Sequence, residues 1–261
     1  MINKNPPTSK PEATEPFLHA RCPLESNCYF SFACLSNNGE RNKGIQDRLS
    51  LDKGEIFMMN SERDESTYTI ISGIASLMTY LPSGESMTVF LLEKSQTFGE
   101  FEVFFQKKPF YAVQALSNVN ICKLNKHHII QFVEENPTFL FKVISAVENN
   151  IQAIGRHIWV MNAQRVQERI MRLLSIFNTL NVSEWGKNMV NLSHEDLALL
   201  INTDRVSVTR VLNKLENEGF VKLGYNQIKV LKPLAMLDLE PNFRLNPLHH
   251  NILSLPVTTQ T

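Results

Sequence analysis

The chain has 261 residues, 43% of them hydrophobic, which suffices for two modest domains with their own cores. Its 26 basic and 26 acidic side chains balance, so it lacks the overall positive field of a protein that coats DNA non-specifically. No apolar run approaches the roughly 20 residues of a membrane helix, and the N-terminus has no signal-peptide core. We therefore expect a cytoplasmic globular protein without a membrane partner, whose four cysteines are thiols, redox sensors or metal ligands.

A polar, proline-rich sequence opens the chain, and we expect residues 1–17 to form a flexible arm. The next run, HARCPLESNCYFSFAC, begins at His19 and contains three of the four cysteines, Cys22, Cys28 and Cys34. In a reducing compartment, such a concentration indicates redox or metal chemistry rather than structural disulfides.

Short runs rich in β-branched and aromatic residues follow, separated by glycines and by the turn Pro82-Ser83-Gly84. They predict strands at 55–58, 67–71, 74–80, 87–92, 111–115 and 120–124. Many short strands at close intervals favour an antiparallel barrel or roll, a fold that holds a small ligand or senses a signal. We place this sensor domain at residues 18–136.

After Pro137 the apolar period becomes helical. Apolar residues follow the alternating spacing of four and three that is typical of a coiled-coil seam: Leu140, Ile144, Val147, Ile151, Ile154, Ile158 and Met161. The alternative is a helix that lies on its own domain, but so strict a seam favours contact with a second copy. We expect a dimerisation helix at residues 137–162 and a homodimer.

Residues 191–215 predict two short helices that meet at a tight turn, within a DNA-binding domain at residues 163–236. Ser193 and Asp196 form a capping-box pair at the start of the first helix, and Asp204 caps the second. Asn202 tolerates the left-handed backbone that the turn needs. A hairpin within 220–230 predicts a wing, and residues 237–261 predict a loose tail.

The second helix of this pair has an apolar face and a polar face. The polar side supplies the DNA-binding candidates: Arg205, Val206, Ser207, Thr209, Arg210 and Asn213. Its guanidinium groups suit guanine edges in a major groove, and Lys222 and Lys229 of the hairpin suit phosphates. The alternative is an ordinary helical hairpin whose charged face is solvated.

A sensor roll, a long helix and a winged helix-turn-helix, in that order, resemble the CRP/FNR superfamily of bacterial transcription regulators. The likeness covers about residues 19–232, and short motifs spread along the chain carry it: Lys53-Gly54-Glu55, Ile71-Ser72-Gly73, Pro82-Ser83-Gly84-Glu85, Phe98-Gly99-Glu100, Gln167-Glu168-Arg169 and Asp204 to Leu212. It implies an α+β fold with a jelly-roll domain like those that bind cyclic nucleotides. It also implies double-stranded DNA and RNA polymerase as partners. A dimer would read a palindrome with half-sites roughly 34 Å apart.

The resemblance also suggests which molecule or cluster the regulator responds to. Nucleotide-binding members hold the cyclic phosphate with an Arg-Ser pair, where this chain has Phe110 and Tyr111, so we do not expect cyclic AMP. The oxygen-sensing FNR branch instead carries a [4Fe-4S] cluster on three N-terminal cysteines and one cysteine in the roll. Cys22, Cys28 and Cys122 match three of those ligands.

The fourth cluster ligand departs from the FNR pattern, because His19 stands where the first cysteine would be. Either Cys34 or His19 would have to complete the set, and thiolate is the commoner ligand. A cluster is therefore one hypothesis, and another thiol-based redox sensor is a second. The alternative is that Cys34 and Cys122 are inert apolar residues.

The stretch RVSVTRVL also resembles regulators of dehalogenation genes. That likeness suggests a small apolar or aromatic effector in the roll, beside Phe110 and Tyr111.

Many family members have a glutamate at the position of Val206, where it accepts from cytosine N4, whereas valine contacts a thymine methyl. The half-site is therefore expected to favour A·T there. No nucleophile elbow, Walker loop or zinc-protease motif points to an enzyme.

Overall fold

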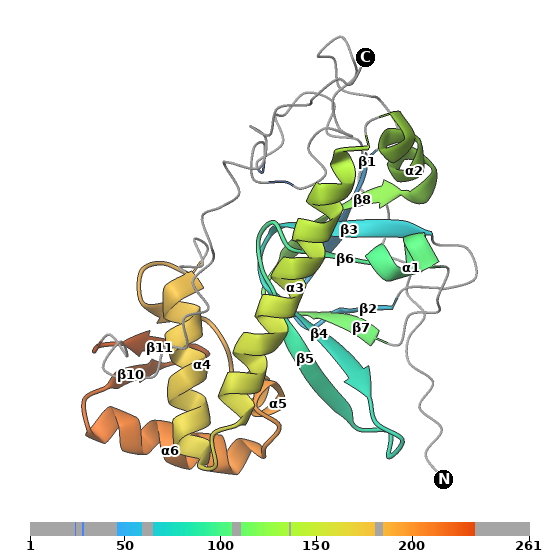
Figure 1. Cartoon of the computed structure of the whole chain (residues 1–261). Helices are drawn as coiled ribbons and strands as arrows, with labels where there is room; N and C mark the ends of the chain where they lie inside the picture. The colour runs from blue at the N-terminus through green and yellow to red at the C-terminus, as the bar shows by residue number, and fades with distance from the viewer. Residues whose placement is uncertain are drawn as a thin grey trace.

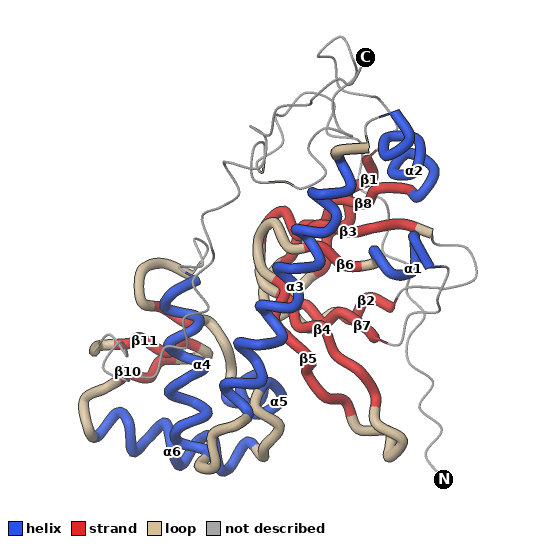
Figure 2. Tube along the Cα trace, viewed as in Figure 1, coloured by secondary structure: helices blue, strands red, loops and turns tan. Residues whose placement is uncertain are grey.

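The structure is a computed structural model that describes residues 24, 28, 46–58, 65–105, 111–135, 137–180 and 185–232. A β-roll, a long helix α3 and a small C-terminal domain follow one another along the chain (Figure 1). Figure 2 shows most of the strands in the roll, while α3 runs along it toward the C-terminal helices. The predicted α+β architecture is confirmed. The predicted arm at 1–17 and tail at 237–261 lie outside the described residues.

The roll consists of two antiparallel four-stranded sheets, with strand orders β1-β8-β3-β6 and β2-β7-β4-β5. Its elements are β1 (Gln46–Leu51), β2 (Ile56–Met58), β3 (Ser66–Ser72), β4 (Ala75–Tyr80), β5 (Ser86–Leu92), β6 (Thr97–Phe98), α1 (Glu100–Phe105), β7 (Tyr111–Ala115), β8 (Val119–Asn125) and α2 (Lys126–Glu135). Each strand expected from the sequence is present; β7 has the predicted ends, and the other strands begin or end within one residue of them. Two strands were not expected: β1, whose residues QDRLSL are mostly polar, and the two-residue β6.

Aromatic rings fill the space between the two sheets. The rings of Tyr68 and Phe98 stack with centroids 5.0 Å apart, and Phe57 meets Tyr68 edge-on at 5.1 Å. Gly73 makes the bend between β3 and β4 with a φ of 86°, and a Cβ there would lie 2.3 Å from the carbonyl oxygen of Asn118. Only glycine fits this close approach, which accounts for the Ile71-Ser72-Gly73 motif.

Helix α3 (Phe139–Met161) lies across the roll and packs against β5 and the following helix. Its buried face includes Val143, Ala146 and Ala153. None of the helices in the described part of the chain has both the length and the apolarity that a membrane crossing requires.

The C-terminal domain contains α4 (Val166–Leu180), β9 (Met189–Val190), α5 (His194–Leu200), α6 (Arg205–Asn217), β10 (Val221–Gly224) and β11 (Gln227–Val230). The predicted hairpin is present, and β9 adds a third strand beside β11 that the sequence analysis missed. Ile74, Leu91 and Leu116 of the roll belong to the same apolar cluster as this domain's core. The β-roll and the C-terminal domain are therefore packed together.

The Gln167-Glu168-Arg169 motif connects the helices of this domain. Gln167 accepts a hydrogen bond from Lys214 of α6 at 2.9 Å, and Glu168 pairs with Arg172 one turn later. Arg169 donates to the carbonyl oxygens of Ala163 and Ile201, at 2.8 and 3.4 Å. The motif thus fixes α4 against the helix-turn-helix.

Candidate nucleic-acid interface

The two helices of the predicted motif begin where their caps were expected, and α6 runs to Asn217, beyond the predicted stretch. Ser193 caps α5, its Oγ accepting from the backbone N–H of Asp196 at 3.1 Å, while Asp196 Oδ2 accepts from the backbone N–H of Ser193 at 2.8 Å. Asn202 supplies the turn with a φ of 49°. Asp204 caps α6 by accepting from the backbone N–H and the hydroxyl of Ser207, at 2.8 and 2.7 Å. The capping box, the left-handed Asn202 and the Asp204 cap are confirmed.

Helix α6 has one buried face and one open face. Val208, Leu212 and Leu215 are at most 1% exposed and anchor it in the domain core. On the other side a shallow hollow is lined by Arg205, Val206, Thr209, Arg210 and Asn213. We call these five residues the reading face. Val206 is 67% exposed, so its side chain is open to a partner.

Ser207, the sixth DNA-binding candidate, does not line this hollow. Its hydroxyl donates to the carboxylate of Asp204, so its side chain completes the cap of α6. The structure therefore brings together five of the six candidates and gives Ser207 a place in the helix cap.

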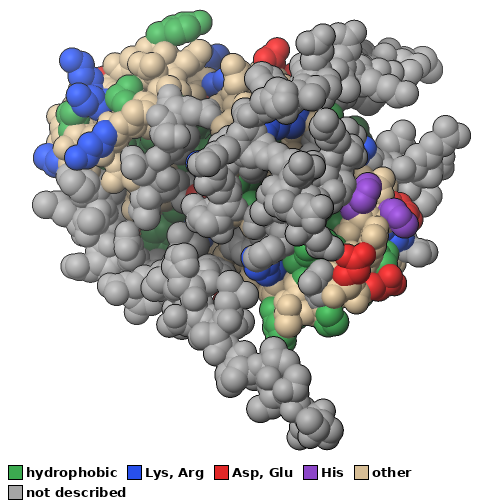
Figure 3. Space-filling view, turned by 90° about the horizontal axis from the view of Figure 1, so that it is seen from above, with side chains coloured by type: hydrophobic (Ala, Val, Ile, Leu, Met, Phe, Trp, Pro, Cys, Tyr) green, Lys and Arg blue, Asp and Glu red, His purple; other side chains and the backbone are tan. Residues whose placement is uncertain are grey.

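Basic side chains also gather on the hairpin. Lys222 of β10 lies directly opposite Lys229 of β11 in the register, and both are exposed. Like charges that face each other across a strand pair are destabilising unless an anion lies between them. On the face drawn in Figure 3, several basic side chains gather at the upper left, and histidines with acidic side chains lie at the right.

His194, the first residue of α5, contacts the reading face. Its Nδ1 lies 2.9 Å from Oγ1 of Thr209, and that hydroxyl donates to the carbonyl oxygen of Arg205 at 2.9 Å. The sequence analysis missed His194, because nothing in a single sequence tells which side chain of the first helix meets the second. Burial and the nearby Arg205 hold the pKa of His194 below its usual value.

A stripe of apolar side chains runs along the outer side of α3. Leu140, Ile144, Ile151 and Ile158 of the predicted seam are 46–62% exposed, and Phe141, which the seam did not include, is 57% exposed. We call these five residues the α3 stripe. Val147, Ile154 and Met161 are half-buried instead, with Ile154 against the roll core and Met161 against the C-terminal core. Helix α3 is therefore oriented so that only some residues of the predicted seam are exposed.

Two of the cysteines are among the described residues. Cys28 is 6% exposed, Cys122 of β8 is half-buried, and both join one apolar cluster with Phe139 and Val143 of α3. The other ligand candidates, His19, Cys22 and Cys34, lie outside the described residues. In the described ranges no three His, Cys, Asp or Glu residues are grouped to hold a metal ion.

Beside Tyr111, where the family resemblance implies a phosphate-binding position, this roll has two buried carboxyl groups, Glu100 and Glu102. Tyr111 donates from its hydroxyl to Oε2 of Glu102 at 3.1 Å. Burial, with a smaller contribution from Glu102, raises the pKa of Glu100 to about 7. Phe110 lies outside the described residues. This region offers carboxyl groups where a phosphate would need cations.

Comparison with known proteins finds one family model for the roll and another for the C-terminal domain. Residues 48–136 match the family model of the cyclic nucleotide-binding domain, and residues 164–239 match that of the Crp-like helix-turn-helix domain. Together the matches span more than half of the chain. The chain belongs to the CRP/FNR family of DNA-binding transcription regulators.

This CRP/FNR regulator is distantly similar to several known members. It is 24% identical to the transcriptional regulator SdrP of Thermus thermophilus, over 75% of this chain and 95% of SdrP. It is 22% identical to the global nitrogen regulator of a Nostoc species, over 72% of this chain and 86% of that protein. FixK2 from Bradyrhizobium japonicum has a TM-score of 0.61 at 16% identity, over 76% of this chain and 99% of FixK2. That structural likeness shows the shared fold.

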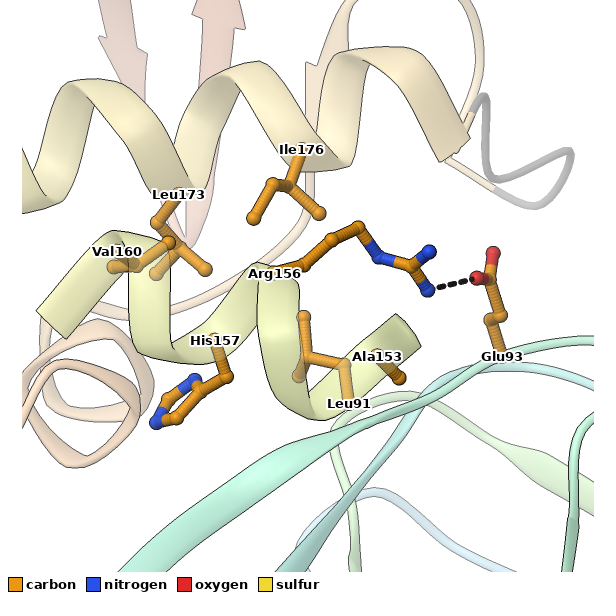
Figure 4. A pocket seen from close by; sticks show the side chains of 8 residues that line it. All are labelled: Leu91, Glu93, Ala153, Arg156, His157, Val160, Leu173 and Ile176. Atoms are coloured by element: carbon orange, nitrogen blue, oxygen red, sulfur yellow. Dashed lines mark hydrogen bonds and ion pairs between the residues drawn. The ribbon is translucent and has the colours of Figure 1, made fainter. Parts of the chain in front are cut away.

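A junction in this CRP/FNR regulator joins the roll to the helices that carry the DNA-binding domain. Arg156 of α3 donates to Oε1 of Glu93, just after β5, at 3.1 Å (Figure 4). Leu173 and Ile176 of α4 line the other side of the same small pocket, and His157 of α3 lies at its edge. Burial raises the pKa of Glu93 against the opposing effect of Arg156, and burial lowers the pKa of His157.

Proposed function

We propose that this CRP/FNR regulator is a homodimer that reads a palindromic operator with α6 and is switched through the thiols of Cys28 and Cys122. The observation that carries the switch is their shared cluster. The two cysteines are far apart in the chain, yet both pack with Phe139 and Val143 at the start of α3. A chemical change at either thiol would alter the packing of the first turns of the helix that bears the dimer contact.

The exposed α3 stripe supports the dimer. Ile144, Ile151 and Ile158 recur at intervals of seven residues and are 56–62% exposed, so a second helix would cover them with the repeat of a coiled coil. Gly155 lies on the same face, between Ile151 and Ile158, and permits a close approach of two helices. Regulators of this family typically act as dimers, and a second copy is the occupant whose own stripe has the matching repeat.

A palindromic operator follows from that symmetry. Two copies of α6 related by a two-fold axis would enter successive major grooves, with half-sites roughly 34 Å apart. The reading face, with Arg205, Arg210 and an exposed Val206, supports base recognition, and the paired Lys222 and Lys229 support phosphate contact. We expect RNA polymerase as a further partner and the cytoplasm, where the DNA lies, as the site of action.

A [4Fe-4S] cluster is one form that the thiol signal could take. Cys28 and Cys122 would be two of its ligands, because both side chains lie in one cluster of the described residues. Cys22 with Cys34 or His19 would have to supply the rest. A cluster bound there would make the state of the site depend on oxidants.

The experiment compares operator affinity of full-length protein kept free of oxygen with that of protein exposed to air. We expect a difference in the wild type that is lost in Cys28→Ala and in Cys122→Ala. Val103→Ala, in the same cluster, is the matched control for altered packing and should keep the difference. Iron, sulfide and visible absorbance of the oxygen-free protein distinguish a cluster from thiol oxidation alone. A double Cys28→Ala, Cys122→Ala variant that still responds to air would overturn the thiol switch.

A small apolar or aromatic effector in the roll is the second candidate. Tyr111 and Glu102 hydrogen bond to each other, and Glu100 is fully buried with a pKa near neutrality, so this region disfavours an anion such as cyclic AMP. Thermal unfolding with cyclic AMP and with a panel of uncharged aromatic compounds tests this candidate. We expect no stabilisation by cyclic AMP, and a hit among the uncharged compounds that is lost in Tyr111→Ala would favour an effector.

A further inference from the structure

His194 lies between the two helices of the helix-turn-helix, at the edge of the reading face. Its Nδ1 is 2.9 Å from Oγ1 of Thr209, and Thr209 belongs to the reading face. The same Thr209 hydroxyl donates to the carbonyl oxygen of Arg205, one turn earlier, at 2.9 Å. A single histidine is thus linked to the residue at the centre of the reading face.

The protons in this chain of hydrogen bonds can be assigned. A threonine hydroxyl has one proton, and Thr209 gives that proton to the carbonyl of Arg205. Its oxygen can then only accept from His194, so Nδ1 of His194 carries a proton. Nε2 consequently carries no proton and can only accept a hydrogen bond when the ring is neutral, and it becomes a donor when the ring is charged.

The surroundings of His194 favour the neutral ring in the free protein. Burial and the positive charge of Arg205 both hold the pKa of His194 below its usual 6.5. Strand β5, which also packs against α5, has the sequence SMTVFLL and contributes no ionisable group. On α5 itself Glu195 is exposed, and the carboxylate of Asp196 is engaged by Lys53 and by the backbone of Ser193.

Nε2 of His194 makes no hydrogen bond with any residue in the described ranges. The ring geometry directs Nε2 away from Nδ1, and therefore away from Thr209. In a helix-turn-helix on DNA the second helix enters the major groove while the first crosses the backbone. With α6 in the groove, the first residue of α5 lies beside the phosphates that border the groove.

We propose that His194 is a positioning residue that fixes Thr209 through Nδ1–H and, on DNA, takes up a proton so that Nε2–H donates to a backbone phosphate. This inference rests on the proposed reading of the groove by α6. Operator binding is then coupled to the uptake of a proton. Arginine side chains alone would not couple it in this way, because they stay protonated. The contact with His194 also gives Thr209 a single hydrogen-bonding role toward bases, because its proton and one lone pair are already committed.

The sign of the pH effect follows from linkage. A phosphate at Nε2 favours the charged ring, so the pKa of His194 is higher on DNA than in the free protein, where it lies below 6.5. Affinity for the operator is greatest at pH values below the pKa of His194 in the free protein. It falls as the pH rises toward the pKa of His194 in the DNA complex, and at higher pH values it is constant. The slope is at most about tenfold per pH unit for each protomer.

The test measures operator affinity of the full-length protein between pH 5.5 and 8 at constant ionic strength, in whichever oxidation state binds. His194→Asn keeps an N–H donor near the position of Nδ1 but cannot take up a proton. His194→Gln places its amide near the position of Nε2 and removes the donor to Thr209. His127→Gln, on the exposed side of α2, is the control for histidine loss elsewhere.

We expect the wild type and His127→Gln to bind more tightly as the pH falls, and His194→Asn to lose that slope while keeping its base preference. His194→Gln should bind with a weaker preference at the base next to Thr209. Ring nitrogen NMR shifts should show a higher His194 pKa with operator than without. A wild-type slope in His194→Asn, or an unchanged base preference in His194→Gln, overturns the inference. Failure of the wild type to select any DNA sequence would instead contradict the proposed function.

Discussion

Nζ of Lys53, in the turn before β2, lies 3.0 Å from Oδ2 of Asp196 in α5. The same carboxylate oxygen accepts from the backbone N–H of Ser193, and Lys53 also donates to the carbonyl oxygen of Asn191 at 3.4 Å. A residue of the β-roll therefore completes the cap of the first helix of the helix-turn-helix. With the apolar contact of Ile74, Leu91 and Leu116, it gives the roll a direct connection to that motif.

Replacing Lys53 with methionine should loosen this connection. The lysine side chain is 38% exposed, so the bridge is worth about 0.2–1 kcal/mol in the free energy of unfolding. Amide hydrogen exchange at residues 193–196 should be faster, and a double-mutant cycle with Asp196→Asn should show coupling. Lys94→Met, an exposed lysine elsewhere on the roll, is the matched control. Equal exchange at 193–196 in both variants would show that the bridge does not support the cap.

Ile151→Asp should separate the dimer. Each isoleucine that leaves apolar contact loses about 1.5–3 kcal/mol, and a two-fold interface contains two copies, so the dimer Kd should rise at least about 100-fold. Sedimentation equilibrium measures this change, and operator affinity should fall with it. Met58→Asp replaces an equally exposed apolar residue on β2 and should leave the dimer intact. An unchanged mass for Ile151→Asp would exclude the α3 stripe as the interface.

The features predictable from the sequence are those that depend on near neighbours in the chain. Ser193, Asn202 and Asp204 work through hydrogen bonds or backbone angles within a few residues, so their roles follow from residue type. The apolar repeat of α3 predicts a helix with a stripe but not which residues of the stripe face its own domain. Ile154 and Met161 accordingly turn inward, whereas Ile144 stays exposed.

The contacts that the sequence could not predict join distant segments. The side chain of Lys53 reaches the backbone of Asn191, 138 residues away, and no pattern in one sequence specifies such a pair. His194 and Thr209 are closer in the chain, but their contact depends on the angle between two helices. These contacts link the β-roll to α5 and α5 to the reading face.

Glu100 should make the stability of the regulator depend on pH. Its pKa is about 7 when folded, against 4.5 for an ordinary glutamate. Below pH 4.5 the carboxyl is protonated in both states. Between pH 4.5 and 7 the unfolded chain loses the proton first, so the free energy of unfolding falls as the pH rises. The total loss is about 3 kcal/mol.

Glu100→Gln should flatten this dependence, because the amide carries no charge in either state. Urea unfolding at several pH values between 4.5 and 8 measures the effect. Glu85→Gln, at an exposed turn, is the control and should retain the wild-type slope. A Glu100→Gln variant with the wild-type slope would mean that another group causes the dependence.

Val206→Glu should change the preferred base pair at one position of each half-site. Val206 is 67% exposed on the reading face and can make only apolar contact, for which the thymine methyl is the best partner. A glutamate there accepts from cytosine N4, so sequences selected from a random pool should change from A·T to C·G, by about 1–3 kcal/mol of discrimination. Val206→Ala is the control and should weaken the A·T preference without creating a new one. A preference for C·G in the wild type that survives in Val206→Ala would show that another residue reads this position.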